Sequence, residues 1–282
     1  MTEVQPVARK LRLSQVAINV FHWPGSGPSM LLLHGAGGNG LWWGDVAGTL
    51  GGHFQLYAPD MRGHGDSDKP ANGYSIGEVV EDIRVLADAL NLDRPILVGH
   101  SYTAKALMYY ADHLPRRTRA LVLVDPTPPE AFRLTPEELE ASLQPLLMEL
   151  GPHATWEDAQ RLARTLPQYR RWNQHLERAF RHGLLESSDG TVMGKTASAT
   201  IREIASQCMA MDTTPSLSGI EARALLLTSS ESEAVLKHSE RISRHIEQCV
   251  WKVLQGNHWL YTDNAEEFHG VVVGFLAEVL RE

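Results

Sequence analysis

The segment Pro95–Tyr110, "PILVGHSYTAKALMYY", joins a short apolar run to a stretch of helical periodicity, and a serine lies at the junction. Its first half fits the pattern G-x-S-x-G, with Gly99 and Ser101 in register. In that pattern a strand turns sharply into a helix, so that the serine is exposed at the end of a sheet. The second half departs from the pattern, because Thr103 stands in place of the second glycine. Whether Ser101 is a nucleophile therefore depends on partners elsewhere in the chain.

Short apolar runs alternate with segments of helical periodicity through much of the chain. The runs cover residues 30–35, 54–60, 95–100, 119–126, 223–230 and 249–258. Such alternation is typical of a parallel sheet flanked by helices. An N-terminal stretch of alternating residues, "LRLSQVAINVFHW", predicts a further strand or hairpin at the edge. We therefore predict an α/β fold with a mostly parallel, doubly wound sheet.

The alternation stops between Pro126 and Arg223, where the patterns indicate helices only. A helical block between two strands of one sheet is interpreted as a lid over the carboxyl edge of that sheet. We assign residues 129–219 to this all-helical lid, which is inserted into the chain. Residues 1–128 and 220–282 then form the core of one α/β domain.

Two helix starts are specified by their capping residues. Ser75 and Glu78 have capping-box spacing in front of an apolar stripe. Thr135 precedes Pro136, a residue that suits the first position of a helix. We expect helices to begin directly after Ser75 and after Thr135.

Composition and charge exclude several classes of partner. The 282 residues carry a formal net charge of −8, which argues against nucleic acid or an anionic membrane as a partner. Cys208 and Cys249 form no C-x-x-C pair and are expected to be reduced thiols. The N-terminus lacks the apolar core of a signal peptide, and no run approaches the roughly 20 apolar residues of a membrane span. The sequence thus predicts a soluble, cytoplasmic protein; it leaves the oligomeric state open.

Polar residues follow the predicted strands at the edge where an open parallel sheet binds ligands. Ser101 follows the third apolar run, Asp125 ends the fourth and His258 ends the sixth. A serine, a carboxylate and a histidine in this order can form a nucleophile, an orienting acid and a general base.

Five segments together resemble the α/β-hydrolase superfamily: "LLLHGAGG", "DMRGHGDSDKP", "VGHSYTA", "VLVDP" and "GNHW". They occur in the order of that family, and the lid lies where the family places its cap. The resemblance implies a serine hydrolase in which Ser101 attacks the substrate and His258 takes the serine proton. It also implies that the backbone N–H groups of Ala36 and Tyr102 form the oxyanion hole.

Two positions compete for the acid of the triad. Many members of the superfamily carry it after the strand that follows the lid, in a pattern like "LLLTGxxDxx". Here that segment reads "LLLTSSESEAV", so Ser232 stands in the aspartate position and Glu231 is out of register. A subset of the family carries the acid before the lid, where "VLVDP" supplies Asp125. We predict Asp125, with Glu231 as the reserve acid.

Other polar residues near the strand ends are given structural roles. In the family that the chain resembles, "DMRGHGDS" is a structural turn, so Asp60, Arg62 and His64 are expected to support that turn. His34 and His100 are expected to orient loops rather than to act in catalysis.

Two further kinds of catalytic centre are not predicted. Lys105 lies one helical turn beyond Ser101, away from the exposed elbow, which argues against a Ser–Lys dyad. No histidine–carboxylate cluster has metal-ligand spacing, so we predict neither a metal nor a cofactor.

The predicted rim of the site is aromatic. We expect five tryptophans to contact the substrate: Trp42, Trp43, Trp156, Trp172 and Trp259. An apolar site under a helical lid suits an uncharged, bulky ester or lactone. The same triad supports hydrolysis of a carbon–carbon bond or acyl transfer. "GHSYTA" also resembles the "GHSxSA" of a branch that includes plant hormone receptors and a bacterial stress regulator, so a ligand sensor with slow turnover stays open.

Overall fold

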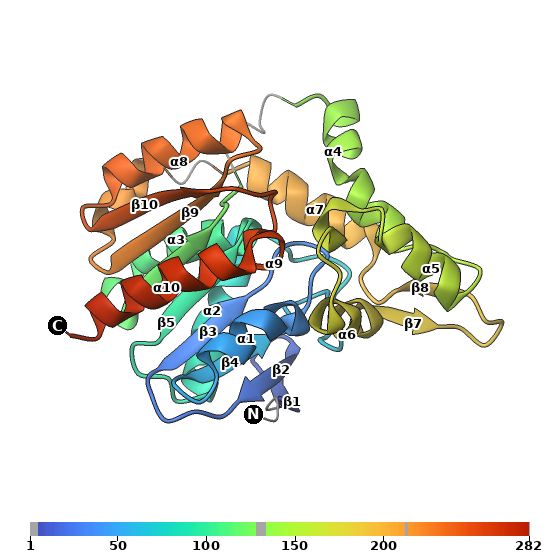
Figure 1. Ribbon diagram of the computed structural model, residues 1–282, viewed down its shortest axis with the longest axis horizontal. Helices are drawn as coiled ribbons and strands as arrows, with labels where there is room; N and C mark the ends of the chain where they lie inside the picture. The colour runs from blue at the N-terminus through green and yellow to red at the C-terminus, as the bar shows by residue number, and fades with distance from the viewer. Residues whose placement is uncertain (1–4, 128–133, 212–213, 282) are drawn as a thin grey trace.

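The computed structural model describes residues 5–127, 134–211 and 214–281 (Figure 1). Its centre is an eight-stranded sheet in the order β1-β2-β4-β3-β5-β6-β9-β10. The strands are β1 Val7–Arg12, β2 Ala17–Trp23, β3 Ser29–Leu33, β4 Gln55–Pro59, β5 Ile96–His100, β6 Ala120–Val124, β9 Arg223–Ser229 and β10 Cys249–Leu254. The pairs from β4 to β10 are parallel, whereas β1 and β2 form an antiparallel edge hairpin.

The central strands are buried on both faces, which explains their continuous apolar sequence. In β5, for example, Ile96 and Val98 enter the core on one face and Leu97 enters the core on the other. This arrangement confirms the predicted α/β class with a mostly parallel, doubly wound sheet.

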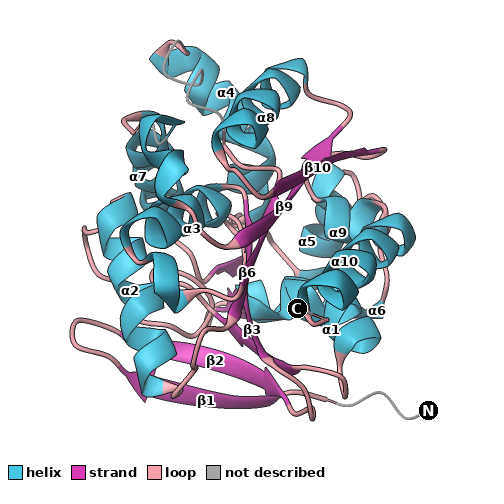
Figure 2. Cartoon of the chain, turned by 90° about the vertical axis from the view of Figure 1, so that its left-hand side faces the viewer, coloured by secondary structure: helices cyan, strands magenta, loops and turns pink. Residues whose placement is uncertain are grey.

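Helices cover both faces of the sheet (Figure 2). They are α1 Gly44–Leu50, α2 Ile76–Ala89, α3 Tyr102–His113, α8 Glu233–His245, α9 Leu260–Asp263 and α10 Ala265–Val279. Helices α2, α3 and α8 lie on one face, and α1 and α10 lie on the other. A capping box of Ser75 and Glu78 starts α2 as predicted.

The segment between β6 and β9, at the right of Figure 1, is the part of the chain predicted to form a lid, and we refer to it by that name. Its helices are α4 Pro136–Glu149, α5 Trp156–Ala163, α6 Gln174–Gly183 and α7 Ser198–Met209. Thr135 caps α4 as predicted. The predicted start of the lid, residue 129, lies outside the described residues.

The expectation of an all-helical lid was wrong at one place. Strands β7 Leu184–Glu186 and β8 Val192–Gly194 form an antiparallel hairpin within the lid. Each strand has three residues, too few to show an alternating pattern. Gly190 adopts a positive φ of 86° in the connecting turn, a conformation that glycine adopts without strain.

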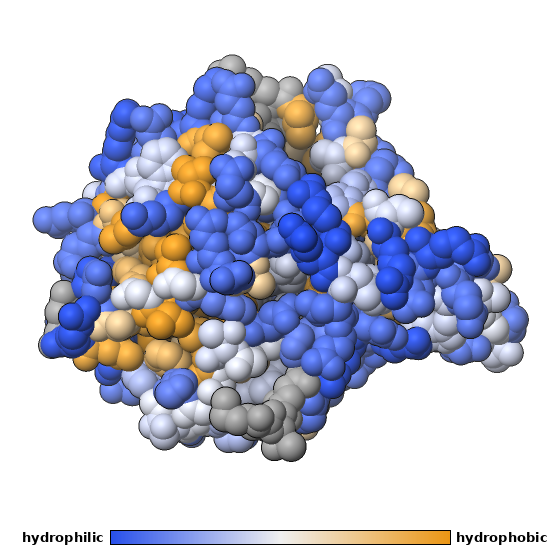
Figure 3. Space-filling view, viewed as in Figure 1, coloured by the Kyte–Doolittle hydropathy of each residue, from blue (hydrophilic) through white to orange (hydrophobic). Residues whose placement is uncertain are grey.

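The surface view shows mainly hydrophilic residues over the lid, whereas apolar residues gather on the opposite side (Figure 3). Val253 of β10 and Val273 of α10 are among the exposed large apolar side chains. Strand β10 is also an edge of the sheet.

Candidate active site

Ser101 lies between β5 and α3 in a strained backbone conformation, with φ 58° and ψ −120°. Its N–H donates to Val124 O at 2.9 Å, which fixes the turn against β6. A Cβ at Gly99 would lie 2.8 Å from Leu107 Cδ1 and 2.9 Å from the Ala104 backbone nitrogen. The first glycine of the pattern is therefore required because α3 packs closely on its own strand.

Asp125 and His258 are joined across the carboxyl edge of the sheet. Asp125 follows β6 and is 1% exposed, and its Oδ2 lies 2.6 Å from Nδ1 of His258. Its other oxygen, Oδ1, accepts the Ser229 N–H at 2.7 Å. Because both carboxylate oxygens have partners, the carboxylate is held in place and orients the imidazole. With the proton on Nδ1, His258 Nε2 is free to accept a proton.

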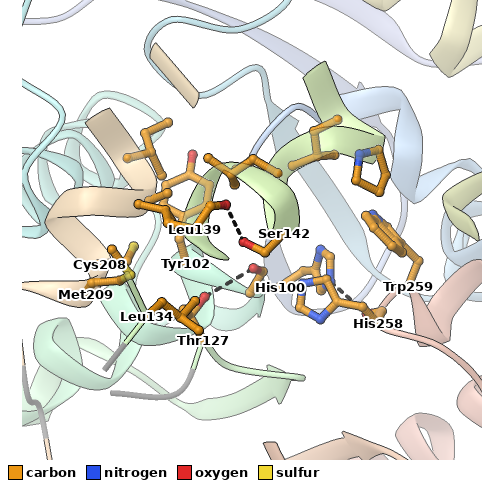
Figure 4. Close-up of a pocket in the computed structure, with 17 residues that line it drawn as sticks. His100, Tyr102, Thr127, Leu134, Leu139, Ser142, Cys208, Met209, His258 and Trp259 are labelled. Carbon is orange, nitrogen blue, oxygen red and sulfur yellow. Dashed lines mark hydrogen bonds between the residues drawn. The ribbon is translucent and has the colours of Figure 1, made fainter. Parts of the chain in front are cut away.

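Ser101 and His258 line the same cavity, but no hydrogen bond joins these two described residues. The serine hydroxyl instead lies 3.3 Å from the Thr127 hydroxyl (Figure 4). In unliganded enzymes such hydrogen bonds are often long and tighten when substrate binds.

The two expected oxyanion donors belong to residues that line the cavity of Ser101. Tyr102 is the first residue of α3, Ala36 follows β3, and both line the cavity. Within the described backbone, neither N–H donates to a carbonyl. A Cβ at Gly35 would lie only 2.5 Å from His100 Nδ1, so the loop of Ala36 packs directly against the elbow.

Two buried histidines support that loop, as expected for His34. Nε2 of His34 accepts the Met61 N–H at 2.9 Å, and Nε2 of His64 accepts the Gly37 N–H at 3.1 Å. Burial lowers the pKa of His34 to about 4 and, with a contribution from His34, lowers the pKa of His64 to about 3. Both rings are therefore neutral near pH 7 and can accept these hydrogen bonds.

His100 and the buried turn after β4 also have structural contacts. Nε2 of His100 lies 2.9 Å from His258 O and thereby holds the backbone of the histidine loop.

In the buried turn after β4, Asp60 accepts the Gly40 N–H at 2.8 Å and lies 2.8 Å from Nε2 of His182 on the lid. Burial opposes ionisation of Asp60, but the hydrogen bond and charge of His182 lower its pKa to about 2. Arg62 forms a two-pronged ion pair with Asp82, at 2.6 and 2.8 Å.

A cavity of about 310 Å³ opens beside Ser101 and His258 (Figure 4). Lid helices α4 and α7 supply most of its apolar wall: Leu139, Leu143, Leu146, Ile204, Ala205 and Met209. Polar side chains in the wall include His100, Thr127 and Ser142. None of the described lining residues is a lysine, an arginine or a carboxylate.

The structure does not bring four of the five predicted tryptophans to this cavity; Trp259 does line it. Trp43 is fully buried and stacks on Tyr261, with ring centroids 4.3 Å apart. Trp42 packs on Tyr169, whereas Trp156 and Trp172 pack on Phe180 within the lid. Trp42 and Trp43 are buried in the core, whereas Trp156 and Trp172 are partly buried against it, so the structure does not place these four side chains at the cavity expected to hold the substrate.

The reserve acid is also placed elsewhere. Glu231 pairs with Arg170 of the lid, at 2.9 and 3.2 Å, and about half of its side chain is exposed. The side chain of Lys105 donates to Cys208 O of α7 at 2.6 Å. We did not predict from the sequence that Thr127 and the apolar residues of α4 and α7 line the cavity. Thr127 lies two residues after Asp125, and this position at a strand end could have indicated a place near the site.

The described residues contain no group of three or more histidine, cysteine, aspartate or glutamate side chains arranged to hold a metal ion. In the same part of the chain, every helix is too short or too polar to cross a membrane.

Known proteins resemble the chain in sequence. The sequence model of the alpha/beta hydrolase fold family matches residues 28–265. The chain is 36% identical over 122 residues to 2-(acetamidomethylene)succinate hydrolase of Mesorhizobium japonicum, covering 43% of this chain and 44% of that protein. It is 34% identical over 128 residues to 2-hydroxy-6-oxo-2,4-heptadienoate hydrolase of Pseudomonas putida, covering 44% and 46%. The chain spans less than half the length of these curated relatives.

The likeness in structure covers nearly the whole chain. The crystal structure of E-2-(acetamidomethylene)succinate hydrolase matches with a TM-score of 0.84, over 96% of this chain and 99% of the other. The two sequences are 23% identical over that match, so this likeness shows the fold alone.

Proposed function

The chain belongs to the alpha/beta hydrolase fold family, and from that premise we propose that it is a serine hydrolase. Its substrate is a carboxylic ester or lactone of a bulky, mostly apolar small molecule. The reaction passes through an acyl-enzyme on Ser101, with His258 as the general base and Asp125 as the acid of the triad.

In the first half of the reaction, His258 Nε2 takes the Ser101 proton while Oγ attacks the substrate carbonyl. The carbonyl oxygen becomes an oxyanion, which the N–H groups of Ala36 and Tyr102 stabilise. His258 then protonates the leaving alcohol, and the ester bond breaks. In the second half, His258 takes a proton from water, the hydroxide attacks the acyl-enzyme, and Ser101 recovers its proton as the acid leaves.

The observation that carries this proposal is the pair formed by Asp125 and His258. The 2.6 Å contact, with the second carboxylate oxygen held by the Ser229 N–H, supports a preorganised base beside the cavity of Ser101. A carboxylate in this place stabilises the imidazolium that forms when the serine loses its proton.

The wall of the cavity supports the class of substrate. Its described side chains are mainly apolar and include no cationic group that would pair with an anionic substrate. An acyl chain or lactone ring gains free energy from burial there, about 0.8 kcal/mol per methylene.

A second candidate is hydrolysis of a carbon–carbon bond. It is favoured by the similarity to the Pseudomonas putida protein, whose name gives an oxo-dienoate as its substrate. The same serine, histidine and oxyanion donors serve that reaction, whereas the leaving group is a carbanion rather than an alcohol.

The experiment is steady-state hydrolysis of p-nitrophenyl acetate, butyrate and octanoate by the wild type, Ser101→Ala and Ser142→Ala. Ser142 is the matched control because it is a cavity serine whose hydroxyl donates to Leu139 O at 2.7 Å. We expect many turnovers in the wild type, a loss of about 10³-fold or more in Ser101→Ala, and little change in Ser142→Ala. Equal rates in wild type and Ser101→Ala would contradict the proposal, and a single burst without turnover would favour a ligand sensor.

A further inference from the structure

Thr103 occupies the position where the elbow pattern has its second glycine, and its side chain is fully buried. Its hydroxyl oxygen accepts the His100 N–H at 3.0 Å. Three carbonyl oxygens lie within reach of its proton: His100 O at 2.8 Å, Leu33 O at 2.9 Å and His34 O at 3.1 Å. One hydroxyl proton serves one carbonyl at a time. When Leu33 O or His34 O accepts it, the side chain joins the end of β3 to the end of β5, where the hydroxyl oxygen accepts the His100 N–H.

These contacts lie next to the two expected oxyanion donors. Thr103 directly follows Tyr102, and His34 lies two residues before Ala36. Between them Gly35 packs on the elbow so closely that a Cβ would lie 2.5 Å from His100 and 3.3 Å from Ser101. By donating to Leu33 O or His34 O, the hydroxyl of Thr103 links the chain just before Ala36 to the helix start at Tyr102.

We propose that Thr103 is a positioning residue that sets the separation of the Ala36 and Tyr102 N–H groups through its buried hydroxyl. This proposal rests on the proposed function, because only an acyl-transfer reaction gives those two donors an oxyanion to stabilise.

Loss of the hydroxyl changes the transition state more than the bound substrate. An oxyanion donor acts when it lies 2.7–3.1 Å from the charged oxygen, and loss of one donor costs about 10²–10³ in rate. Thr103→Val keeps the branched shape but leaves the His100 N–H without this acceptor and frees the loop. Because both donors stay present but shift, we expect kcat to fall about 10- to 100-fold, less than for a complete loss.

The test compares Thr103→Val with Thr103→Ser, which keeps the hydroxyl and loses the methyl group. The probes are p-nitrophenyl butyrate and a trifluoromethyl ketone with the same acyl chain. When the ketone binds, Ser101 Oγ adds to its carbonyl carbon, the serine proton passes to His258, and the ketone oxygen becomes the oxyanion. In Thr103→Val we expect the inhibition constant of the ketone to rise by the same factor by which kcat falls, with KM changed less than about threefold. Thr103→Ser restores both values.

A lower melting temperature in Thr103→Val with unchanged kcat and unchanged ketone affinity would overturn the proposal and leave Thr103 as a packing residue. If Thr103→Val does not fold, Thr103→Gly replaces it, because it also lacks the hydroxyl and carries the residue of the pattern. The same losses are expected in that variant.

Hydrogen–deuterium exchange separates this proposal from the proposed function. Without the hydroxyl, peptides that contain residues 34–38 are expected to exchange at least about tenfold faster in the valine variant than in the wild type, whether or not an ester is cleaved. If the valine variant exchanges faster but the wild type hydrolyses no ester, the serine-hydrolase proposal is contradicted and the anchoring role of Thr103 stands. If residues 34–38 exchange at the same rate in the valine variant and the wild type, the anchoring role of Thr103 is overturned, whether or not the protein is active.

Discussion

Asp125 and His258 are 133 positions apart in the sequence, and their side chains meet at 2.6 Å across the ends of β6 and β10. Strand β9 lies between those two strands and supplies the Ser229 N–H that holds the second oxygen of Asp125. The acid, its backbone donor and the base thus come from three successive strands of the sheet. Glu231, which follows β9, is turned to the lid through Arg170.

The position of Asp125 predicts which carboxylate variant loses activity. Asp125→Asn removes the charge and reverses the tautomer of His258, so kcat for p-nitrophenyl butyrate should fall by about 10⁴. Glu231→Gln breaks only a half-exposed ion pair, and kcat should change less than about threefold. A larger loss in the Glu231 variant would contradict this assignment of the acid.

Glu149 predicts a pH dependence of stability. It is buried in the lid, where Tyr169 and Gln168 donate hydrogen bonds to it, and burial raises its pKa to about 7. Since the folded pKa lies above the unfolded value of 4.5, this group's stabilisation is complete below about pH 4.5 and is lost as the pH rises through 7. The total effect is on the order of 3 kcal/mol.

Thermal unfolding of wild type and Glu149→Gln at pH 5 and pH 8 checks this prediction. The neutral amide of the variant has no ionised form to bury. The melting temperature of the variant minus that of the wild type should therefore be higher at pH 8 than at pH 5. An equal difference in melting temperature between variant and wild type at pH 5 and at pH 8 would show that Glu149 does not titrate in this range.

The cavity wall predicts how acyl-chain preference can be changed. Ala205 of α7 lines the cavity, so Ala205→Phe should fill part of it and hinder long chains. The ratio of kcat/KM for p-nitrophenyl octanoate to that for the acetate should fall at least about tenfold, since a methylene in such a pocket is worth roughly 1–3 kcal/mol. Trp172→Phe is the control because Trp172 packs on Phe180, outside the cavity, and the ratio should stay the same. A ratio unchanged by Ala205→Phe would place the acyl chain elsewhere.

We expect two glycine substitutions to differ in their effects, because one new Cβ meets close neighbours and the other meets none. Gly35→Ala places a Cβ 2.5 Å from His100 Nδ1, which must displace the loop of Ala36, so kcat should fall more than about 100-fold. Gly270→Ala lies in α10 with nothing within 4 Å of the new Cβ. It should raise stability by about 0.5–1 kcal/mol and leave kcat unchanged. Calorimetry and steady-state kinetics measure both; full activity in Gly35→Ala would mean that the loop is free to move away.

Much of the fold could be predicted from the sequence because its signals are local. The strands are continuous apolar runs, and the capping residues Ser75 and Thr135 mark two helix starts where the structure has them. The order of Ser101, Asp125 and His258 along the chain also indicated that they would meet, because carboxyl ends of parallel strands share one edge.

Features that depend on packing between distant segments were not predicted. In the sequence, Trp43 and Trp172 cannot be told apart from Trp259 as candidates for substrate contact. Which of these side chains reaches the cavity depends on how the lid packs on the sheet. The β7–β8 hairpin is too short to show a period. The hydroxyl of Thr103 could be recognised as a departure from the pattern, but its partners Leu33 and His34 lie about 70 residues earlier in the chain.

The proposed reaction requires Ser101 to be a nucleophile activated by His258 and Asp125. The most direct measurement is intact-mass and peptide analysis after treatment with a fluorophosphonate, which transfers a phosphonyl group to an activated serine with loss of fluoride. We predict one group per chain, attached to Ser101 in the wild type, absent in Ser101→Ala and formed much more slowly in Asp125→Asn. Labelling of another residue, or equal labelling of wild type and Ser101→Ala, would contradict the proposal.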